Sequence, residues 1–160
     1  MDFNTTSANS VRVIDYTPDH QPWFEKLNRE WIEEFFWMEP IDEAVLQRPD
    51  EHLISHGGAI LMATVHHEIA GTVALKYVTT GVYEFTKMAV DKKFRGQKVG
   101  LLLSEAAIAK ARDLGANKII LYSNTVLAPA IALYRKLGFH EVPLDGPYKR
   151  SNIKMELPLT

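Results

Sequence analysis

The chain has 160 residues, 46% of them hydrophobic, which is enough for one buried core, so a single domain over residues 1–160 is expected. The absence of cysteine excludes a disulfide framework, a thiolate metal site and a cysteine nucleophile, and it fits a cytoplasmic location. The net charge of −2, the polar residues 1–10 and the lack of an apolar run near ~20 residues argue against nucleic acid and membranes as partners.

Hydrophobic periodicity in the first half of the chain predicts two helices and three strands. The strands are expected at residues 11–16, 59–65 and 69–78, and the helices at 21–36 and 42–56, the second interrupted near Pro49. Apolar residues of the first helix recur every three or four positions, as one buried face requires. They are Phe24, Leu27, Trp31 and Phe35. We therefore interpret the aromatic residues of this segment as core residues and not as a substrate cage: Trp23, Trp31, Phe35, Phe36 and Trp37.

Two adjacent histidines, His66 and His67, separate the predicted strands 59–65 and 69–78. Neighbouring residues on a strand point to opposite faces, and no third ligand follows at a useful spacing, so the pair does not indicate a metal site. We predict that both histidines lie in the turn of a hairpin, and we expect no metal cofactor.

The second half of the chain is predicted to alternate strands and helices. Strands are expected at residues 82–90, 118–123, 139–142 and 152–157, and helices at 98–114 and 128–137. Gly115 and Gly138 directly follow the two helices, where glycine commonly ends a helix. The whole order predicts one mixed sheet with helices packed on it.

The segment from Val90 to Gly100 joins a predicted strand to a predicted helix through a basic turn that contains glycine. The first turn of a helix has unpaired backbone N–H groups and the positive end of the helix dipole, so it attracts anions. Arg95 and Lys98 add full positive charges. Gly96 and Gly100 would let a phosphate or a neighbouring strand approach closely. The glycine patterns of P-loop and dinucleotide-binding proteins are absent, which disfavours both of those classes. The turn has the build of a phosphate cradle, but taken alone it is more typical of a solvated basic loop before an ordinary helix.

Two parts of the chain resemble motifs of the GNAT superfamily of acyl-CoA-dependent N-acyltransferases, in its bacterial type. The first is Glu84–Val90 followed by Arg95–Gly100, and the second is Asn124 followed by Ala130–Phe139. One departure is Lys98, which stands where the family's loop has glycine; lysine still offers a backbone N–H if the position does not need a glycine-only angle. The resemblance implies an α/β (α+β) fold with a mixed, mostly antiparallel central sheet flanked by about four helices.

The resemblance further implies that acetyl-CoA is the co-substrate and lies between the strand of Glu84 and the strand 118–123, which would separate after Val90. The pantetheine arm would pair with backbone like a strand, and the pyrophosphate would bind the N–H groups of the following turn. The implied cofactor-binding residues are Met88, Ala89, Val90, Arg95, Gly96, Gln97, Lys98, Val99, Gly100, Leu101, Asn124 and Tyr134.

The chemistry of this family implies catalytic roles for Glu84 and Tyr134. Glu84 occupies the position that several members use as general base, because an amine of pKa ~10 must lose a proton before it attacks. Tyr134 matches the tyrosine that gives a proton to the coenzyme A sulfur, and the backbone N–H of Met88 is the implied oxyanion donor. The alternative bases are Glu33, Glu34 and Tyr83.

The acceptor is expected to be a small-molecule or peptide amine, bound by the N-terminal helices and the turn at residues 79–83, for which no motif exists. Acidic residues favour a cationic acceptor, whereas aromatic residues could make it partly apolar. The acidic ones are Glu33, Glu34, Glu39 and Asp42, and the aromatic ones are Trp31, Phe36 and Trp37.

Two alternatives to a small-molecule N-acetyltransferase stay open at this point. One is a catalytically silent acyl-CoA-binding sensor or interaction module, and the other is an acetyltransferase of protein N-termini or lysines. A homodimer through the apolar closing strand at residues 153–157 is also left open.

Overall fold

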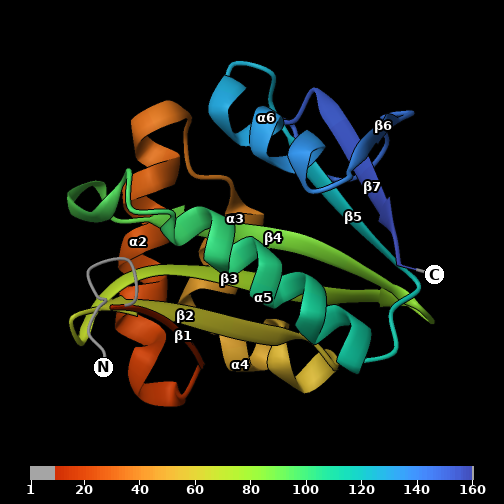
Figure 1. The fold of residues 1–160 in the computed structure, drawn as a ribbon. Coiled ribbons are helices and arrows are strands. Elements are labelled where there is room, and N and C mark those ends of the chain that lie inside the picture. Colours follow the sequence, from red (N-terminus) through yellow and green to blue (C-terminus); the bar gives the residue numbers. More distant parts are fainter. Residues whose placement is uncertain (1–9, 160) are drawn as a thin grey trace.

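The computed structural model describes residues 10–159, which form a seven-stranded sheet with helices on both faces (Figure 1). The strand order is β1-β2-β3-β4-β5-β7-β6. All neighbouring strands are antiparallel except β4 and β5, which are parallel. The predicted fold class, a mixed and mostly antiparallel sheet between helices, is therefore confirmed.

The element bounds agree with the predicted ones to within a few residues, apart from the predicted helix at 42–56. The strands are β1 (Val11–Asp15), β2 (Ala59–Val65), β3 (Glu68–Thr79), β4 (Val82–Val90), β5 (Lys118–Ser123), β6 (His140–Val142) and β7 (Ile153–Pro158). The helices are α2 (Gln21–Phe35), α3 (Pro40–Gln47), α4 (Pro49–His52), α5 (Val99–Asp113) and α6 (Ala128–Lys136), with the 3₁₀ turns η1 (Pro18–His20), η2 (Ile54–His56) and η3 (Lys92–Phe94).

The predicted helix at 42–56 is three separate pieces, and Pro49 accounts for the first of the two breaks. Proline lacks a backbone N–H and is favoured in the first turn of a helix, where that N–H would have no partner. Pro40 accordingly starts α3, and Pro49 ends it and starts α4, so five α-helices stand among the described residues where about four were expected.

Two apolar clusters hold the helices to the two faces of the sheet. On one face, α5 contributes Leu103 and Ala107 to a cluster with strand residues such as Phe85. On the other face, Phe24 and Ile32 of α2 pack with Leu46 of α3 and with β2. Each fully buried Leu, Ile or Phe side chain contributes about 1.5–3 kcal/mol to the free energy of folding by removal of its apolar surface from water. The sheet is therefore fixed between two layers.

The interpretation of all α2 aromatic residues as core residues is wrong for Trp23, Phe35 and Trp37, which are exposed. Phe35 lies on the last turn of α2 and is 43% exposed, although it continues the apolar spacing. Periodicity defines a helix face, but it does not show how far the opposing layer extends. Figure 1 shows the end of α2 rising beyond the edge of the sheet, so little covers its last turn.

Strand β4 bends at a β-bulge. Thr72 pairs with Ala89 and Ala74 pairs with Thr86, so two residues of β4 face one residue of β3. Lys87, one of the two, has a positive φ of 57°. A bulge bends its strand and increases the local twist. The bulge therefore turns β4 away from its neighbour β5.

The separation of β4 from β5 begins earlier than expected. The parallel pairing covers only Val82–Lys118, Tyr83–Ile119 and Glu84–Ile120, after which the strands diverge (Figure 1). The prediction that they separate after Val90 is therefore wrong, since pairing ends after Glu84. The bulge at Lys87 bends β4 and so explains the earlier separation. It was not predicted, because no motif in the sequence marks the position of a bulge. Backbone groups of β4 beyond Glu84 are thus open on the β5 side.

His66 and His67 form the two-residue turn between β2 and β3, as predicted. Both have positive φ, 49° and 70°, which is the requirement of the turn type that matches strand twist. Within residues 10–159, no group of three or more histidine or acidic side chains could hold a metal ion.

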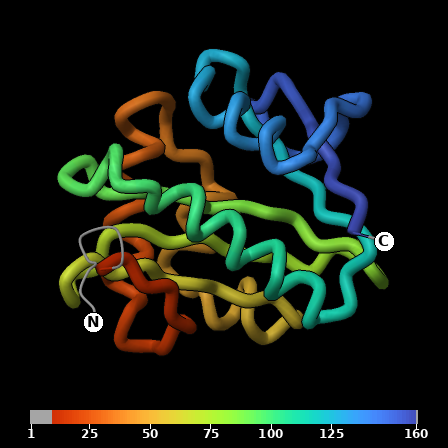
Figure 2. Tube along the Cα trace, viewed as in Figure 1, coloured from red at the N-terminus to blue at the C-terminus, as the bar shows by residue number. Residues whose placement is uncertain are grey.

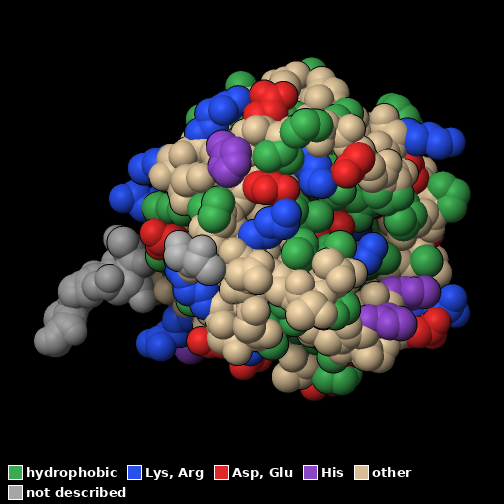
Figure 3. Space-filling view, turned by 90° about the vertical axis from the view of Figure 1, so that its right-hand side faces the viewer, with side chains coloured by type: hydrophobic (Ala, Val, Ile, Leu, Met, Phe, Trp, Pro, Cys, Tyr) green, Lys and Arg blue, Asp and Glu red, His purple; other side chains and the backbone are tan. Residues whose placement is uncertain are grey.

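The surface carries both signs of charge. On the face in Figure 3, basic and acidic side chains lie among hydrophobic ones, and neither sign covers that face. Of the helices between residues 10 and 159, none combines the length and the apolar character that crossing a membrane requires.

Candidate active site

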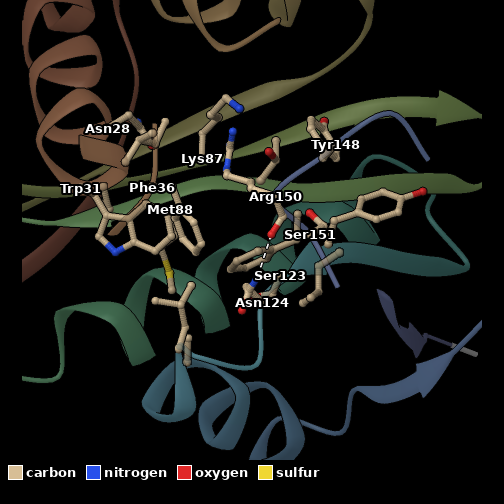
Figure 4. Close-up of a pocket in the computed structure, with 18 of the residues that line it drawn as sticks. Asn28, Trp31, Phe36, Lys87, Met88, Ser123, Asn124, Tyr148, Arg150 and Ser151 are labelled. Atoms are coloured by element: carbon tan, nitrogen blue, oxygen red, sulfur yellow. Dashed lines mark hydrogen bonds between the residues drawn. The ribbon is translucent and has the colours of Figure 1, made fainter. Parts of the chain in front are cut away.

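A cleft lies where β4 and β5 diverge, and it is lined by α2, β4, β5, α6 and the loop between β6 and β7 (Figure 4). Several residues singled out from the sequence line it together: Glu84, Met88, Ala89, Val90, Arg95, Asn124 and Tyr134. The other predicted cofactor residues, Gly96 to Leu101, do not line this cleft and form the turn beyond Arg95 and the start of α5. The two predicted catalytic side chains thus share one cleft.

The turn before α5 has the geometry of an anion site. Within the described chain, the backbone N–H groups of residues 96–101 have no hydrogen-bond partner. Lys98, at the N-cap, has φ 66° and ψ 20°, the left-handed conformation that non-glycine residues adopt at a cost of about 1–2 kcal/mol. The lysine at the family's glycine position is therefore compatible with the turn.

The two glycines of the turn differ in what they require. Gly96 has a φ of 86°, which side chains rarely adopt, and open space around it. At Gly100, an added Cβ would lie 3.9 Å from Met88 and Val90, an ordinary contact. The neighbouring strand therefore does not require a glycine at position 100, which leaves the approach of a phosphate as the other expected reason for it.

Arg95 is ion-paired in this structure. Its guanidinium lies 3.0 Å from the carboxylate of Glu34 on α2, and Lys92 lies 3.9 Å from the same carboxylate. Figure 2 shows the segment around residue 95 beside the upper end of α2. Arg95 borders the cleft, so a phosphate there would compete with Glu34 for its guanidinium.

Glu84 is the carboxylate of the cleft. It is 4% exposed, and Tyr148 Oη donates a hydrogen bond to its Oε2 at 2.8 Å. Burial raises the pKa of Glu84, against the opposing effects of this hydrogen bond and of Lys76 and Lys87. A carboxylate with a raised pKa is a stronger base, which suits the removal of a proton from an amine.

The alternative bases are less suited by position. Among the described residues that line the cleft, Glu84 is the one acidic side chain. Glu33 is exposed on α2 and lies outside the cleft, and Glu34 is paired with Arg95. Tyr83 belongs to the apolar cluster on the α5 face of the sheet.

Tyr134 of α6 is buried in aromatic surroundings at the cleft. Its ring lies 5.8 Å from that of Phe85 and 5.9 Å from that of Phe139, both edge-on. Burial raises the pKa of Tyr134 to about 12, so its hydroxyl keeps its proton at neutral pH. Burial is the one cause of this raised pKa, with no contribution from a hydrogen bond within residues 10–159, and Tyr134 lines the cleft, where its proton is available to a ligand.

Asn124 connects two loops at the cleft. Its Nδ2 donates to the backbone oxygen of Arg150 at 2.8 Å, and its Oδ1 accepts from the backbone N–H of Val126 at 3.0 Å (Figure 4). One donor and one lone pair of the amide remain for a ligand. Asn124 thus also fixes the loop that carries Tyr148.

A cluster of four charged side chains, each at most 13% exposed, lies at the acceptor end of the cleft. Arg150 bonds Asp42 through two nitrogens, at 2.5 and 2.9 Å, and Glu39 at 3.0 Å. Lys87 Nζ, whose side chain is 6% exposed, lies 2.9 Å from Asp42 Oδ1. Burial alone would raise the pKa of Asp42, but Arg150 and Lys87 outweigh it and hold that pKa at about 2. We refer to Glu39, Asp42, Lys87 and Arg150 as the buried charge cluster.

The buried charge cluster argues against the expectation that Glu39 and Asp42 attract a cationic acceptor. Glu39 and Asp42 were predicted to attract a cationic acceptor, but both are neutralised by Arg150 and Lys87. Neither acidic residue lines the cleft, whereas both basic residues do. Glu39 and Asp42 therefore offer no free negative charge to an acceptor.

Sequence reasoning missed several cleft residues, among them Asn28, Lys87, Tyr148 and Arg150. Asn28 had a signal, since it stands four residues from both Phe24 and Ile32 on the buried face of α2. Tyr148 and Arg150 had none, because they lie in a loop between two short strands. A loop residue joins a site only through the tertiary fold.

The sequence pattern of the acetyltransferase (GNAT) family matches residues 20–139. The chain belongs to the GNAT acetyltransferase family. It is 32% identical over 122 residues to the IAA acetyltransferase of Azospirillum brasilense, a match that covers 74% of this chain and 75% of the relative. The protein is therefore an acetyl-CoA-dependent N-acetyltransferase that acts on an amine.

Solved GNAT structures have the same fold as this acetyltransferase. A GNAT acetyltransferase from Staphylococcus aureus Mu50 superposes with a TM-score of 0.84 at 20% identity, over 94% of this chain and 99% of the other. The phosphinothricin acetyltransferase of Sinorhizobium meliloti, solved in complex with acetyl-CoA, gives a TM-score of 0.77 at 16% identity over 94% and 89%. At such identities these likenesses concern the fold.

Proposed function

We propose that this acetyltransferase moves the acetyl group to a primary amine by direct attack in a ternary complex, with Glu84 as general base and Tyr134 as proton donor. The observation that carries the proposal is the position of Glu84. It is a buried carboxylate with a raised pKa that lines the same cleft as a protonated Tyr134. An acid and a base in one cleft are what the two proton transfers of this reaction need.

The proposed reaction involves one bond formed and one broken. The amine nitrogen attacks the carbonyl carbon of the thioester, a C–N bond forms, and the C–S bond breaks. Glu84 accepts a proton from the amine, directly or through water, and Tyr134 gives a proton to the sulfur that leaves. The products are the N-acetyl amine and the free thiol of coenzyme A. The absence of cysteine in the chain fits a reaction without a thioester-linked enzyme.

Backbone groups would bind the acetyl-CoA. The N–H groups of residues 96–101 would hold the pyrophosphate, with Arg95 and Lys98 adding charge. Met88, Ala89 and Val90, on the part of β4 that has left β5, would pair with the pantetheine arm, with Asn124 opposite. The N–H of Met88 would donate to the thioester oxygen as negative charge develops there.

The test is thiol release from acetyl-CoA with a panel of polyamines, amino acids, aminoglycosides, aryl amines and peptides. Wild type is compared with Tyr134→Phe and Glu84→Gln. We expect amine-dependent release that falls by about 100-fold in each variant. The dissociation constant of acetyl-CoA is expected to stay within about threefold for Tyr134→Phe, because the hydroxyl acts on the departing sulfur.

Two results would contradict the proposed roles. Unchanged turnover in Tyr134→Phe would remove it as the proton donor. Tight acetyl-CoA binding without turnover on any amine would instead support the sensor alternative. Glu105→Gln serves as the matched control for Glu84→Gln, since Glu105 is exposed on α5 and lies outside the cleft.

A further inference from the structure

We infer that the acceptor is a monoamine with an apolar body, and that Asn28 recognises its amino group. This inference rests on the proposed function, because it assumes that the amine is acetylated in the cleft of Glu84. Three features carry it: an amide whose acceptor atom has no partner among the described residues, an apolar wall on α2, and a cleft in which Glu84 is the one acidic side chain among the described lining residues.

Asn28 presents an unpaired hydrogen-bond acceptor to the cleft. The residue is 1% exposed and lies between Phe24 and Ile32 on the buried face of α2. Its Nδ2 donates to the backbone oxygen of Phe24 at 3.0 Å. This bond fixes the amide orientation, because a carbonyl oxygen can accept only from the Nδ2 end.

The oxygen of the same amide, Oδ1, therefore points away from the Phe24 carbonyl. Asn28 Oδ1 has no partner among residues 10–159, and Asn28 lines the cleft (Figure 4). Because Asn28 lines the cleft, a ligand that supplies an N–H can donate a hydrogen bond to this oxygen in place of solvent. The amide thus favours a ligand with a donor at this point, as an amine has.

The wall next to Asn28 is apolar. Trp31 and Phe36 line the cleft with Ile32, and the rings of Trp31 and Phe36 lie 6.2 Å apart. In Figure 4 these side chains stand on the α2 side of the cleft, with Asn28 above them. Such a wall stabilises the apolar body of a ligand by removing its surface from water.

The charged side chains of the cleft disfavour a second ammonium group. Among the described residues that line the cleft, Glu84 is the one carboxylate, and the proposed reaction uses it for the amine that attacks. Lys87 and Arg150 also line the cleft, but Asp42 and Glu39 compensate their charges. A second ammonium group would therefore leave water without a carboxylate partner, which is costly. The cleft thus disfavours polyamines.

Matched amines test the class of acceptor. Hexylamine and hexamethylenediamine have the same chain length and differ in the second amino group, and phenethylamine adds an aromatic body. We expect kcat/KM for both monoamines to exceed that of the diamine by about tenfold or more. A diamine used as well as hexylamine, or better, would overturn the inference. No release with any amine would contradict the proposed function itself, so the two failures are distinguishable.

Variants of α2 test the residues. For Asn28→Ala we expect KM for phenethylamine to rise by about tenfold while KM for acetyl-CoA stays within about twofold. Phe36→Ala should also raise the amine KM, and Trp23→Ala, which removes an exposed ring of α2 outside the cleft, should not. Equal effects of these two changes would exclude an acceptor site on α2, even if Asn28→Ala does not fold.

Discussion

Two halves of the proposed site, a cofactor half that runs from the cleft to the turn before α5 and an acceptor half inside the cleft, are built in different ways. The cofactor half uses backbone groups of one continuous stretch, from the bulge at Lys87 to the first turn of α5. The acceptor half uses side chains of α2, α3, β4 and the loop between β6 and β7. Backbone binding constrains only a few residues of a short motif, whereas side-chain binding depends on which distant segments meet.

This difference explains why a motif exists for one half only. An anion can be held by N–H groups of any residue, provided that the turn geometry is correct. The acceptor half has no such freedom, since Asn28, Glu84 and Tyr148 act through specific atoms. Changes in the acceptor half should therefore disturb stability and specificity. Changes in the turn should have only small effects on the free energy of unfolding.

The largest effect is expected for Asp42→Asn. This change leaves Arg150 and Lys87 buried without their carboxylate partner, and breaking a buried ion pair on one side costs about 3–5 kcal/mol. Denaturant unfolding at neutral pH measures the loss. Asp50→Asn, an equal change at an exposed position, should cost less than about 0.5 kcal/mol. Similar losses for both would mean that the cluster does not stabilise the acceptor half.

The next effect concerns the pH dependence of Glu84. A general base must be ionised, so kcat/KM should fall toward acid pH, with its midpoint above the ordinary glutamate pKa because burial raises the pKa of Glu84. In Glu84→Gln we expect a loss of about 100-fold at pH ~8, roughly 3 kcal/mol, and no acid limb from this group. A profile with the same acid limb in the variant would assign that limb to another group.

Acid is expected to have a smaller effect on the free energy of unfolding. The pKa of Asp42 is about 2 in the folded protein, against 3.8 for the free side chain. A lowered folded pKa stabilises the protein above the unfolded pKa, and this contribution, roughly 2 kcal/mol, is lost as the pH falls from about 4 to about 2. The free energy of unfolding of wild type and Asp42→Asn should converge over that range. Constant separation would show that Asp42 does not titrate there.

The smallest effects belong to the turn of the cofactor half. Lys98→Gly removes the cost of the left-handed conformation and should raise the unfolding free energy by up to about 1 kcal/mol, while Lys98→Ala should not. Gly96→Ala, at φ 86° in open space, should lower it by about 1 kcal/mol. Thermal unfolding measures all three. A stabilised Lys98→Ala would show that the conformation is not the cause.

Most of the fold could be predicted from the sequence, because strands such as β2, β4 and β5 have apolar patterns that end at clear turn signals. The elements that differ do so for local or contextual reasons. Pro49 divides a predicted helix, and the end of α2 extends past the layer that would cover Phe35. The sequence shows the proline directly, but it does not show how far the layer that would cover Phe35 extends.

By itself, the sequence determined the order of the elements, the basic turn at residues 95–100, and the positions of Glu84 and Tyr134 in motifs of the family. These depend on hydrophobic periodicity and on short segments whose backbone geometry is local. Only the tertiary structure decided where β4 leaves β5, and that Arg150, not an acceptor, neutralises Asp42. Residues 108 positions apart meet there because the sheet brings the last loop over α3, and no local pattern encodes such a contact.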